Sequence, residues 1–285
     1  MIKNINYFFQ SLIIYFFFLV GRILGLAIGR KIYAYLFSVI GPIIKSREVI
    51  KNNLNIFLKN NSFQNEEKII SNMWKNYGMT FIEYIFLDYF KKGNSHITVN
   101  GEENLPSKIQ GGKPVIFISG HFANYELMSM EITKREIPLA TIYRPLNNIF
   151  LNPFMEYLRK KYICKNQIKK GTNGVREAIQ YIKKKYCLAL MIDQRVSEGE
   201  NLNFFGKPAL TTTLPARLSI KFDLDIIPVF IQRDENNNFR IEFQKSVNPK
   251  NFKNKIELSK ELNKILERMV VKNPDQWIWT HNRWK

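Results

Sequence analysis

Short apolar runs alternate with amphipathic segments from residue 115 onward. The apolar runs have the length of buried strands and lie at residues 115–119, 139–143, 187–192 and 226–232. Segments with apolar residues at helical spacing lie between them, at residues 125–134, 153–161, 174–184 and 214–222. A hairpin turn at 236–238 leads to a further strand at 239–243, and a helix follows at 256–271. This order predicts an α/β fold with a mostly parallel central sheet flanked by helices.

The chain before residue 100 is mainly helical by the same criterion. Helical spacing extends over 48–58 and 66–89, and a short strand is predicted at 97–99. The second of these helices carries a broad apolar stripe of the kind that usually belongs to a core. The stripe is formed by Trp74, Tyr77, Phe81, Tyr84 and Ile85. Because no internal repeat or long linker is present, we predict one large domain with an N-terminal appendage.

The appendage is an apolar N-terminal segment. Residues 4–21 carry no charge, and Leu12 to Val20 are wholly apolar or aromatic. A membrane span needs roughly 20 apolar residues, so Arg22 makes this a span of borderline length. The alternatives are a cleavable signal peptide and a buried soluble helix. The lack of a clear small-residue cleavage motif soon after the run argues against the first, and the phenylalanines at 16–18 favour lipid contact.

Positive charge follows the apolar run, at Arg22, Arg30 and Lys31. Residues that flank a membrane segment on its cytoplasmic side are enriched in such charge. We therefore predict an uncleaved anchor helix over residues 1–30 and a second domain over residues 31–285 on the cytoplasmic side of the membrane.

The composition excludes some classes of site and points to anionic partners. With 45% apolar residues the chain can form a sizeable core. Cys164 and Cys187 do not make a disulfide framework, and with three histidines they show no zinc spacing. We expect reduced thiols and no structural metal. The net charge of +19 points to anionic lipid, nucleic acid or acidic protein, unless the excess of lysine reflects an AT-rich genome.

His121 and Glu126 are the most informative pair of residues for function. They lie five apart and directly follow the apolar run at 115–119, so the histidine falls at a strand-to-helix turn. α/β enzymes place catalytic groups at such turns. If the histidine folds back, Glu126 can fix its tautomer and leave the other ring nitrogen to accept a proton from a hydroxyl. The alternative is a half-buried histidine that is satisfied by a nearby acid.

Further charged residues follow the predicted strands. Arg144 ends the strand at 139–143, where it either binds a phosphate or an oxyanion or is a solvated loop residue. Asp193 and Arg195 leave the strand at 187–192. These two either line the site or form a structural ion pair.

Two aromatic segments complete the pattern. Phe204 and Phe205 are adjacent in a predicted loop, where they either wall a channel for an alkyl chain or fill a gap in the core. Three tryptophans among the last nine residues predict a tail that docks on the fold. His281 in this tail is a second candidate for chemistry, with packing as the alternative.

Taken together, these segments resemble the LpxL/LpxM (HtrB/MsbB) group of lipid A biosynthesis acyltransferases, within the wider lysophospholipid acyltransferase superfamily. The order and spacing of the motifs fit over nearly the whole chain, including the apolar N-terminal helix and the tryptophan-rich end. The histidine-x4-acid motif carries Glu126 as its acid, and Arg22 shortens the anchor. The matching segments are 120–126, 143–145, 193–195, 204–206, 227–230 and 277–285.

The resemblance implies an O-acyl transfer at the inner membrane, without a cofactor or metal. An acyl carrier protein thioester would be the donor, and a hydroxyl of a phosphorylated lipid A precursor would be the acceptor. His121 would be the general base and Glu126 would orient it. Arg144, Asp193, Arg195, Phe204 and Phe205 would bind substrate. The partners of the positive charge would then be the glycolipid, the anionic membrane surface and the acidic carrier protein rather than nucleic acid.

Other functions remain open from the sequence. An acyltransferase of the same fold could act on another glycolipid or a lysophospholipid, with acyl coenzyme A as donor. A basic membrane-binding or nucleic-acid-binding protein would explain the charge but not the position of His121 and Glu126. A hydrolase with a nucleophilic serine is disfavoured because no Gly-x-Ser-x-Gly motif is present.

Overall fold

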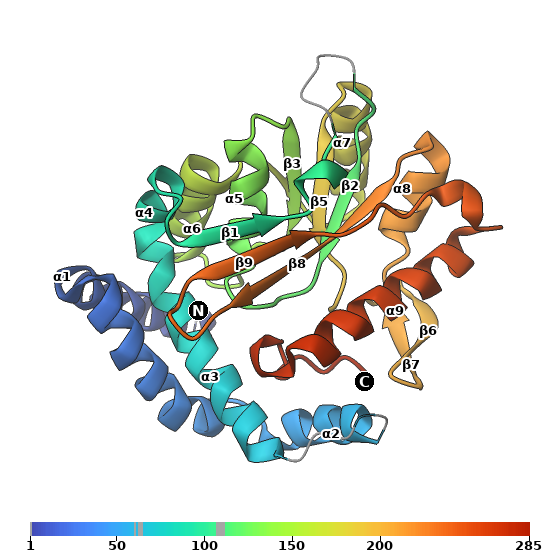
Figure 1. Ribbon diagram of the computed structural model, residues 1–285. Helices are drawn as coiled ribbons and strands as arrows, with labels where there is room; N and C mark the ends of the chain where they lie inside the picture. The colour runs from blue at the N-terminus through green and yellow to red at the C-terminus, as the bar shows by residue number, and fades with distance from the viewer. Residues whose placement is uncertain (1, 60, 62–64, 107–111) are drawn as a thin grey trace.

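A seven-stranded sheet forms the centre of the protein in the computed structural model, which describes residues 2–59, 61, 65–106 and 112–285 (Figure 1). The strand order is β1-β9-β8-β2-β5-β3-β4, and each neighbouring pair is parallel except β8 and β9. The strands of this sheet are β1 (Ile97–Asn100), β2 (Ile116–Ser119), β3 (Leu139–Tyr143), β4 (Asn166–Lys169), β5 (Cys187–Met191), β8 (Ile226–Arg233) and β9 (Phe239–Phe243). The expected mostly parallel α/β sheet is thus confirmed.

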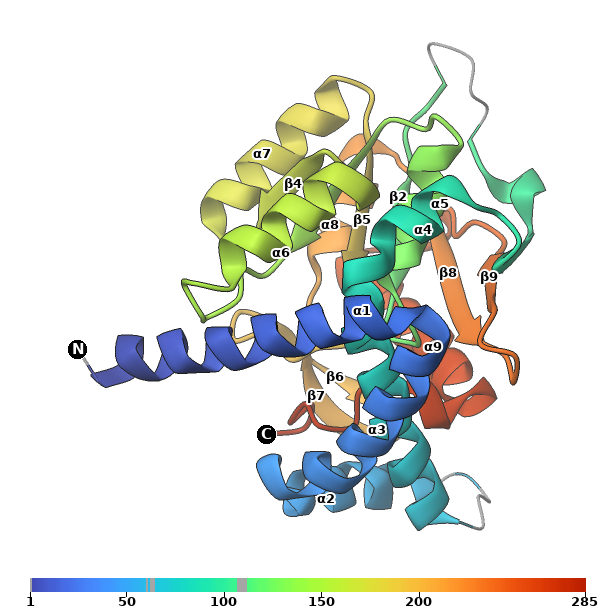
Figure 2. The ribbon, with the colours of Figure 1, turned by 90° about the vertical axis from the view of Figure 1, so that its left-hand side faces the viewer.

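Helices cover both faces of this sheet (Figures 1 and 2). They are α1 (Ile2–Ile44), α2 (Arg47–Leu58), α3 (Glu66–Glu83), α4 (Leu87–Lys92), α5 (Glu126–Lys134), α6 (Asn152–Leu158), α7 (Thr172–Lys183), α8 (Leu214–Phe222) and α9 (Lys255–Lys272). Short helical turns lie at 84–86, 102–104, 249–251 and 274–276, and a π-helical turn at 159–163 extends α6. The helix α5 connects β2 to β3, and α7 connects β4 to β5. Because such crossovers are right-handed, the two helices lie on opposite faces.

The predicted strands and helices are present within a few residues of their expected bounds, but three strands were not predicted. β4 is a polar edge strand that pairs only with β3. β6 (Glu200–Phe204) and β7 (Lys207–Thr211) form a separate antiparallel hairpin where we expected a loop. Its turn consists of Phe205 and Gly206, both with positive φ (51° and 71°). Few apolar residues alternate in these strands, so their pattern resembles that of loops.

The N-terminal helix is broken near its middle. Gly25 has φ 77° and ψ 165°, which divides α1 into a first segment (residues 2–24) and a second segment (residues 26–44). Figure 2 shows the first segment projecting from the body and the second running back along α3. The expected boundary at residue 30 lies inside the second segment, and the helix continues to Ile44. By length and composition α1 could cross a membrane.

The second segment of α1 packs closely on α3. A Cβ added to Gly78 would lie 2.0 Å from the carbonyl oxygen of Tyr33, so only glycine permits this approach. Arg30 of α1 reaches the fully buried Glu83 at the end of α3, with its Nε 2.7 Å from Oε1. Arg233 of β8 pairs with the same carboxylate. The helix that was expected to be an appendage is therefore tied into the centre of the fold.

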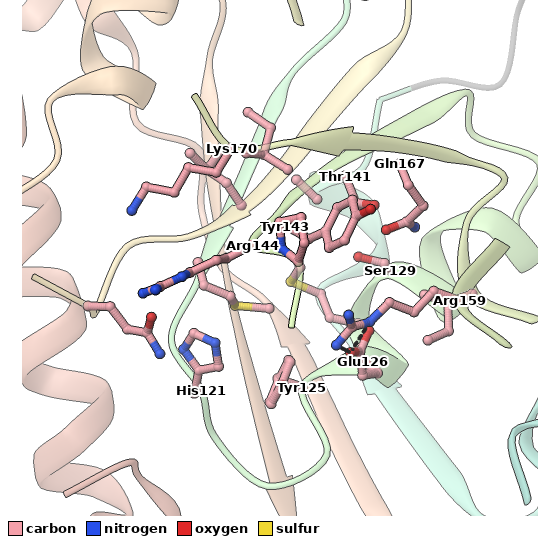
Figure 3. Close-up of a pocket in the computed structure, with 18 of the residues that line it drawn as sticks. His121, Tyr125, Glu126, Ser129, Thr141, Tyr143, Arg144, Arg159, Gln167 and Lys170 are labelled. Carbon is pink, nitrogen blue, oxygen red and sulfur yellow. Dashed lines mark hydrogen bonds and ion pairs between the residues drawn. The ribbon is translucent and has the colours of Figure 1, made fainter. Parts of the chain in front are cut away.

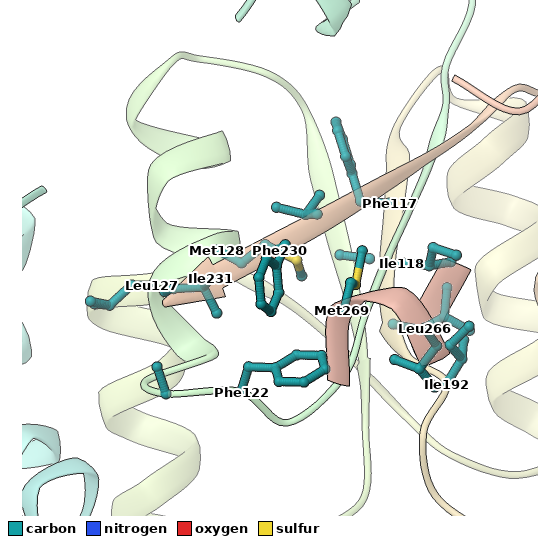
Figure 4. Close-up of a cluster of buried hydrophobic side chains, with 14 of the residues drawn as sticks. Phe117, Ile118, Phe122, Leu127, Met128, Ile192, Phe230, Ile231, Leu266 and Met269 are labelled. Carbon is teal, nitrogen blue, oxygen red and sulfur yellow. The ribbon is translucent and has the colours of Figure 1, made fainter. Parts of the chain in front are cut away.

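The core lies between the sheet and its helices. Figure 4 shows part of it, where Phe122 from the loop after β2 meets Phe230 of β8. Their rings are 5.1 Å apart and nearly perpendicular, a favourable aromatic geometry. Leu266 and Met269 of α9 close the same cluster. The loop that follows His121 is thus anchored by a buried aromatic ring.

Candidate active site

His121 lies at the carboxyl end of β2 and is held by Asp193, which follows β5. The strands β2 and β5 are neighbours, so residues that leave their carboxyl ends meet at one edge of the sheet. His121 Nδ1 is 2.7 Å from Asp193 Oδ1, and the His121 backbone N–H donates to Oδ2 at 2.7 Å. One carboxylate therefore fixes both the backbone and the ring of the histidine.

Asp193 is fully buried and ionised. Burial alone would raise its pKa, but the neighbouring His121 and the hydrogen bonds that the carboxylate accepts hold the pKa below its ordinary value. One of these bonds comes from the indole N–H of Trp277, at 3.0 Å. Because an ionised carboxylate can only accept, Nδ1 of His121 carries the proton. This leaves the Nε2 lone pair as the basic position.

The loop after His121 is fixed from several elements. Ala123 has a positive φ of 44°, and its N–H and carbonyl are bound by the Gln276 carbonyl and the Thr80 hydroxyl. The Asn124 side chain donates to Glu83 Oε2 at 2.9 Å. Burial alone would raise the pKa of Glu83, but Arg233 and Arg30 hold it below its ordinary value. The buried carboxylate that binds α1 also binds the loop that follows His121.

Glu126 begins α5, as expected, but its partners are Arg159 and Tyr84. Arg159 Nε donates to Glu126 Oε1 at 2.8 Å, and the Tyr84 hydroxyl donates to the same oxygen at 2.5 Å. Burial alone would lower the pKa of Arg159, but Glu126 and its other neighbours raise it, so the guanidinium is charged.

The expectation that Glu126 orients the His121 ring is therefore corrected. No hydrogen bond joins these two side chains in the described part of the chain, and Figure 3 shows Tyr125 between them. The Tyr125 ring meets the imidazole edge to face, with 4.6 Å between ring centroids. The physical reason is the helix start at Glu126, which turns its side chain toward α6 while His121 faces β5. The carboxylate that orients His121 is Asp193.

A cavity of about 410 Å³ opens beside His121. Figure 3 shows His121 and Arg144 at one side, and Ser129, Thr141 and Gln167 at the other. The lining mixes polar groups with an apolar wall that α5, the turn after α6, and β5 contribute. The apolar wall includes Met128, Ile142, Ile163, Ala189, Leu190 and Met191. The cavity also has three cationic side chains in its lining, Arg144, Lys170 and the Arg159 that is paired with Glu126. Such a site, with the His121 nitrogen and an apolar wall, can hold a chain next to a polar reacting group.

The remaining candidates divide between the site and the core. Arg144 lines the cavity, whereas Asp193 reaches it only through His121. Arg195 does not belong to the lining that the structure describes, and its backbone N–H donates to His281 Nε2 at 2.8 Å. Burial keeps the pKa of His281 below its ordinary value, which suits an accepting neutral ring. His281 thus has a packing role, and the expected alternative of an Asp193–Arg195 ion pair is absent from the contacts of the described residues.

Phe204 and Phe205 lie in the core rather than along the described lining of the cavity. Phe204 stacks on Trp284 with 5.5 Å between ring centroids, and Phe205 meets Phe57 at 5.2 Å. The prediction of an alkyl channel at these residues thus finds no support, and the alternative of a filled core gap fits their position. The tryptophan-rich tail docks on the same hairpin, as predicted.

Several site residues were not found from the sequence. Tyr84 was assigned only to a core stripe, and Arg159 and Trp277 were given no role in the site. Arg159 lies in the π-helical turn after α6, and no local motif identifies it. The signal for Trp277 was the tail itself, whose docking brings the indole to Asp193 across 84 residues of sequence.

Groups for other kinds of chemistry are not assembled at this cavity. Within the described residues, no three of His, Cys, Asp and Glu gather as metal ligands would. Cys164 and Cys187 are free and buried, burial raises the pKa of both thiols, and neither is among the described lining residues. Of the ionisable groups that line the cavity, His121 is the one whose ring is oriented by a buried carboxylate, which makes it the candidate for proton transfer.

Known proteins that are similar to this chain include two acyltransferases of lipid A biosynthesis and one solved acyltransferase structure. The palmitoleoyltransferase of lipid A biosynthesis from Escherichia coli (strain K12) is 24% identical over 262 residues, which cover 86% of this chain and 80% of that protein. The lipid A biosynthesis acyltransferase of Shigella flexneri matches equally well. Among solved structures, the 1-acyl-sn-glycerophosphate (LPA) acyltransferase PlsC from Thermotoga maritima aligns with a TM-score of 0.43 and 17% identity, over 87% of this chain and 99% of that one.

The family model for bacterial lipid A biosynthesis acyltransferases matches residues 2–285. The matched range takes in the apolar N-terminal helix, the His121 loop and the tryptophan-rich tail. This chain therefore belongs to the bacterial lipid A biosynthesis acyltransferase family and is an acyltransferase.

Proposed function

We propose that this enzyme moves a fatty acyl chain from an acyl carrier protein thioester to a hydroxyl of a lipid A precursor, with His121 as general base. The observation that carries the proposal is the 2.7 Å contact between His121 Nδ1 and Asp193 Oδ1 beside a large cavity. Asp193 takes the orienting role that we first expected of Glu126. Glu126 lines the same cavity and is paired with Arg159, and a catalytic role for it stays a prediction.

The reaction needs one proton transfer in each direction. His121 Nε2 takes the proton of the acceptor hydroxyl, and the oxygen attacks the thioester carbonyl carbon. The C–S bond then breaks, and the imidazolium returns the proton to the leaving thiolate. The products are an ester and a free thiol. Asp193 stabilises the imidazolium between these steps, as a buried carboxylate does in other His–Asp pairs.

Two of the three cations at the cavity supply candidates for anion recognition, since the third, Arg159, is paired with Glu126. Arg144 and Lys170 both line it, and burial together with the Arg144 charge lowers the pKa of Lys170. A negative ligand beside them would relieve this repulsion. We assign to Arg144 either the developing oxyanion of the thioester or a phosphate of the acceptor.

The apolar surface of α1 supports membrane association. Its first segment exposes a series of large apolar side chains, which are Ile5, Phe8, Phe9, Leu12, Ile13, Phe16, Leu19 and Ile23. The loop after β3 extends this surface, because Phe8 meets Phe150 at 5.5 Å and the Tyr15 hydroxyl donates to the Phe150 carbonyl. Leu146 of that loop lines the cavity. The proposed setting is the cytoplasmic face of the inner membrane, with the cavity opening beside the lipid.

Mass spectrometry of products tests the proposal. Purified enzyme in detergent micelles receives a tetra-acylated lipid A precursor with acyl carrier protein and coenzyme A donors of equal chain length. We expect a penta-acylated product, formed mainly from the carrier protein donor, and loss of most turnover in His121→Ala. His96→Phe is the matched control, because His96 is buried between aromatic rings and its ring nitrogens have no partner among the described residues.

The outcomes separate the alternatives. Product formation on a lysophospholipid but not on the lipid A precursor would move the acceptor to the related class of acyltransferases. Retained turnover in His121→Ala would show that His121 is not the general base. A coenzyme A preference would overturn the carrier protein as donor and leave the acceptor assignment standing.

A further inference from the structure

A row of neutral polar side chains lies deep in the cavity, away from His121. Thr141 of β3 pairs in register with Gln167 of β4 on one side and with Ala189 of β5 on the other. Partners in register on parallel strands point to the same face, so these three side chains stand next to one another. Thr141 is two residues in from the end of β3, whereas Arg144 lies beyond that end and is exposed. The row is therefore inside the cavity rather than at its mouth.

Ser129 of α5 faces this row from the helix layer. Figure 3 shows Ser129, Thr141 and Gln167 close together on the side of the cavity opposite His121. Ser129 and Thr141 are nearly buried, at 6% and 8% exposure. We call Ser129, Thr141 and Gln167 the polar row. Ala189 is small and leaves space beside it.

The hydrogen-bonding capacity of the polar row is largely unused. Gln167 donates from Nε2 to the Cys164 carbonyl at 2.8 Å, which leaves its amide oxygen without a partner in the described structure. Thr141 is the most engaged of the three, because its hydroxyl contacts the Asn166 carbonyl at 3.5 Å and also interacts with the Cys164 thiol. Ser129 Oγ has no hydrogen bond within the described residues. The Ser129 hydroxyl and the Gln167 amide oxygen face the cavity and are not among the described atoms that are sealed without a partner, so a ligand or water in the cavity can supply their hydrogen bonds.

The surroundings of the polar row fit an acyl chain. Met128, Ile163 and Leu190 line the same part of the cavity and offer alkyl contact. An unsubstituted chain would cover the polar row without satisfying it. A hydroxyl on the chain could donate to the Gln167 amide oxygen and accept from the Ser129 hydroxyl.

We propose that the polar row selects an acyl donor that carries a hydroxyl group on its chain. This inference rests on the proposed function and adds the substrate class of the donor. A site built to bind a hydroxyl rejects the analogue that lacks it far more strongly than an apolar pocket rejects an extra hydroxyl, because its own polar groups are then left unpaired. The polar row thus sets specificity and takes no part in the proton transfer at His121.

Competition between donors tests the proposal. The enzyme receives equimolar carrier protein thioesters of one chain length, unsubstituted or hydroxylated at different carbons, with a lipid A precursor. We expect at least one hydroxylated chain to be transferred about tenfold or more in preference to the unsubstituted chain. In Ser129→Ala combined with Gln167→Met, this ratio should fall toward unity or invert. Gln180→Met is the matched control, because it makes one of the same changes at an exposed position of α7 outside the described lining and should keep the ratio.

Each outcome decides a separate point. A preference of the unaltered enzyme for the unsubstituted chain over every hydroxylated one would overturn the inference and leave the proposed function intact. Transfer of no donor at all would overturn the proposed function, and the inference with it. A hydroxyl preference that survives in the double variant would remove the assignment to the polar row. Because the first comparison uses the unaltered enzyme, it does not depend on the folding of any variant.

Discussion

At the scale of single residues, the carboxylate that holds His121 belongs to Asp193, which lies outside the motif around the histidine. Asp193 lies 72 residues from His121 and binds both its backbone and its ring. The acid nearest in sequence, Glu126, is engaged with Arg159 and Tyr84 instead. Sequence spacing identified the histidine because a strand-to-helix turn can be seen in a local pattern. It could not identify the histidine's partner, because that contact depends on β5 lying next to β2.

Asp193→Asn tests the His121–Asp193 pair. The amide keeps the size of the side chain but cannot stabilise the imidazolium, and it can hold the ring in the wrong tautomer. We expect kcat to fall by a factor of about 10² to 10⁴, with little change in KM. Steady-state kinetics with circular dichroism as a folding control measure this. Unchanged kcat in a folded variant would contradict the pairing.

Glu126→Gln tests the ion pair between Glu126 and Arg159. Removing this charge leaves the Arg159 guanidinium buried without a counter-ion, which typically costs about 3–5 kcal/mol. We expect a clear loss of stability in denaturant unfolding, together with reduced turnover. The double variant Glu126→Gln, Arg159→Met removes both charges and should recover much of the stability. If the single variant is as stable as the unaltered protein, the ion pair is not a structural element.

Stability should also decline in acid. Glu83 and Asp193 have pKa values below their ordinary values of 4.5 and 3.8. Their contribution is therefore present above those ordinary values and is lost as the pH falls through the lower, folded-state values. Denaturant unfolding between about pH 6 and about pH 3 should show this loss. Asp193→Asn should lose less stability over the same range, and an equal loss in both proteins would assign the effect to other carboxylates.

At the scale of elements, one buried carboxylate joins α1 and α3 to the loop that follows His121. Glu83 of α3 binds Arg30 of α1, Arg233 of β8 and Asn124 of the loop. The alternation of strands and helices was predictable because apolar periodicity is a local property. β4, β6 and β7 were not, since their residues are largely polar and become strands only through pairing. The packing of the second segment of α1 against α3 was not predicted, because its apolar residues suit contact with lipid and with protein equally well.

Gly78→Ala should separate α1 from α3. The added Cβ would lie 2.0 Å from the Tyr33 carbonyl oxygen, so a helix backbone must move. We expect a loss of several degrees in melting temperature in detergent and a loss of activity. Gly29→Ala is the matched control, because its Cβ would meet a side-chain atom of Ile82 at 3.3 Å and the Gly21 carbonyl oxygen at 3.8 Å, an ordinary contact distance. Equal melting temperatures in the two variants would show that the close approach is not required.

At the scale of the whole molecule, the apolar surface and the cavity mouth lie on connected elements. The first segment of α1 contacts the loop after β3, and that loop leads from the cavity to α6. This connection could not be read from the sequence, because 135 residues separate Tyr15 from Phe150. For the proposed lipid acceptor, we expect this connection to provide the path between the membrane and the cavity.

Charges placed on this loop should weaken membrane binding. Ile149 and Phe150 are 55% and 40% exposed. In Ile149→Glu combined with Phe150→Glu, we expect weaker sedimentation with anionic vesicles and lower activity on vesicle-bound acceptor, but ordinary activity on detergent-dispersed acceptor. Ile220→Glu, another exposed apolar residue on α8, is the control that should bind as before. Unchanged vesicle binding in the loop variant would place the lipid contact on α1 alone.

The break at Gly25 has a consequence for anyone who wishes to prepare a water-soluble form of the enzyme. Removal of residues 1–24 would delete the first segment of α1 and keep the ion pair between Arg30 and Glu83. Removal of residues 1–44 would expose the side of α3 that packs against α1, and Glu83 would keep only Arg233 of its two described arginine partners. We expect this shorter protein to aggregate or to lose the conformation of the loop that follows His121. Gly25 therefore separates the part of α1 that holds Glu83 from the part that exposes apolar surface, although the cut would also remove the contacts of Tyr15 with Phe150 and of Arg22 with Asp88.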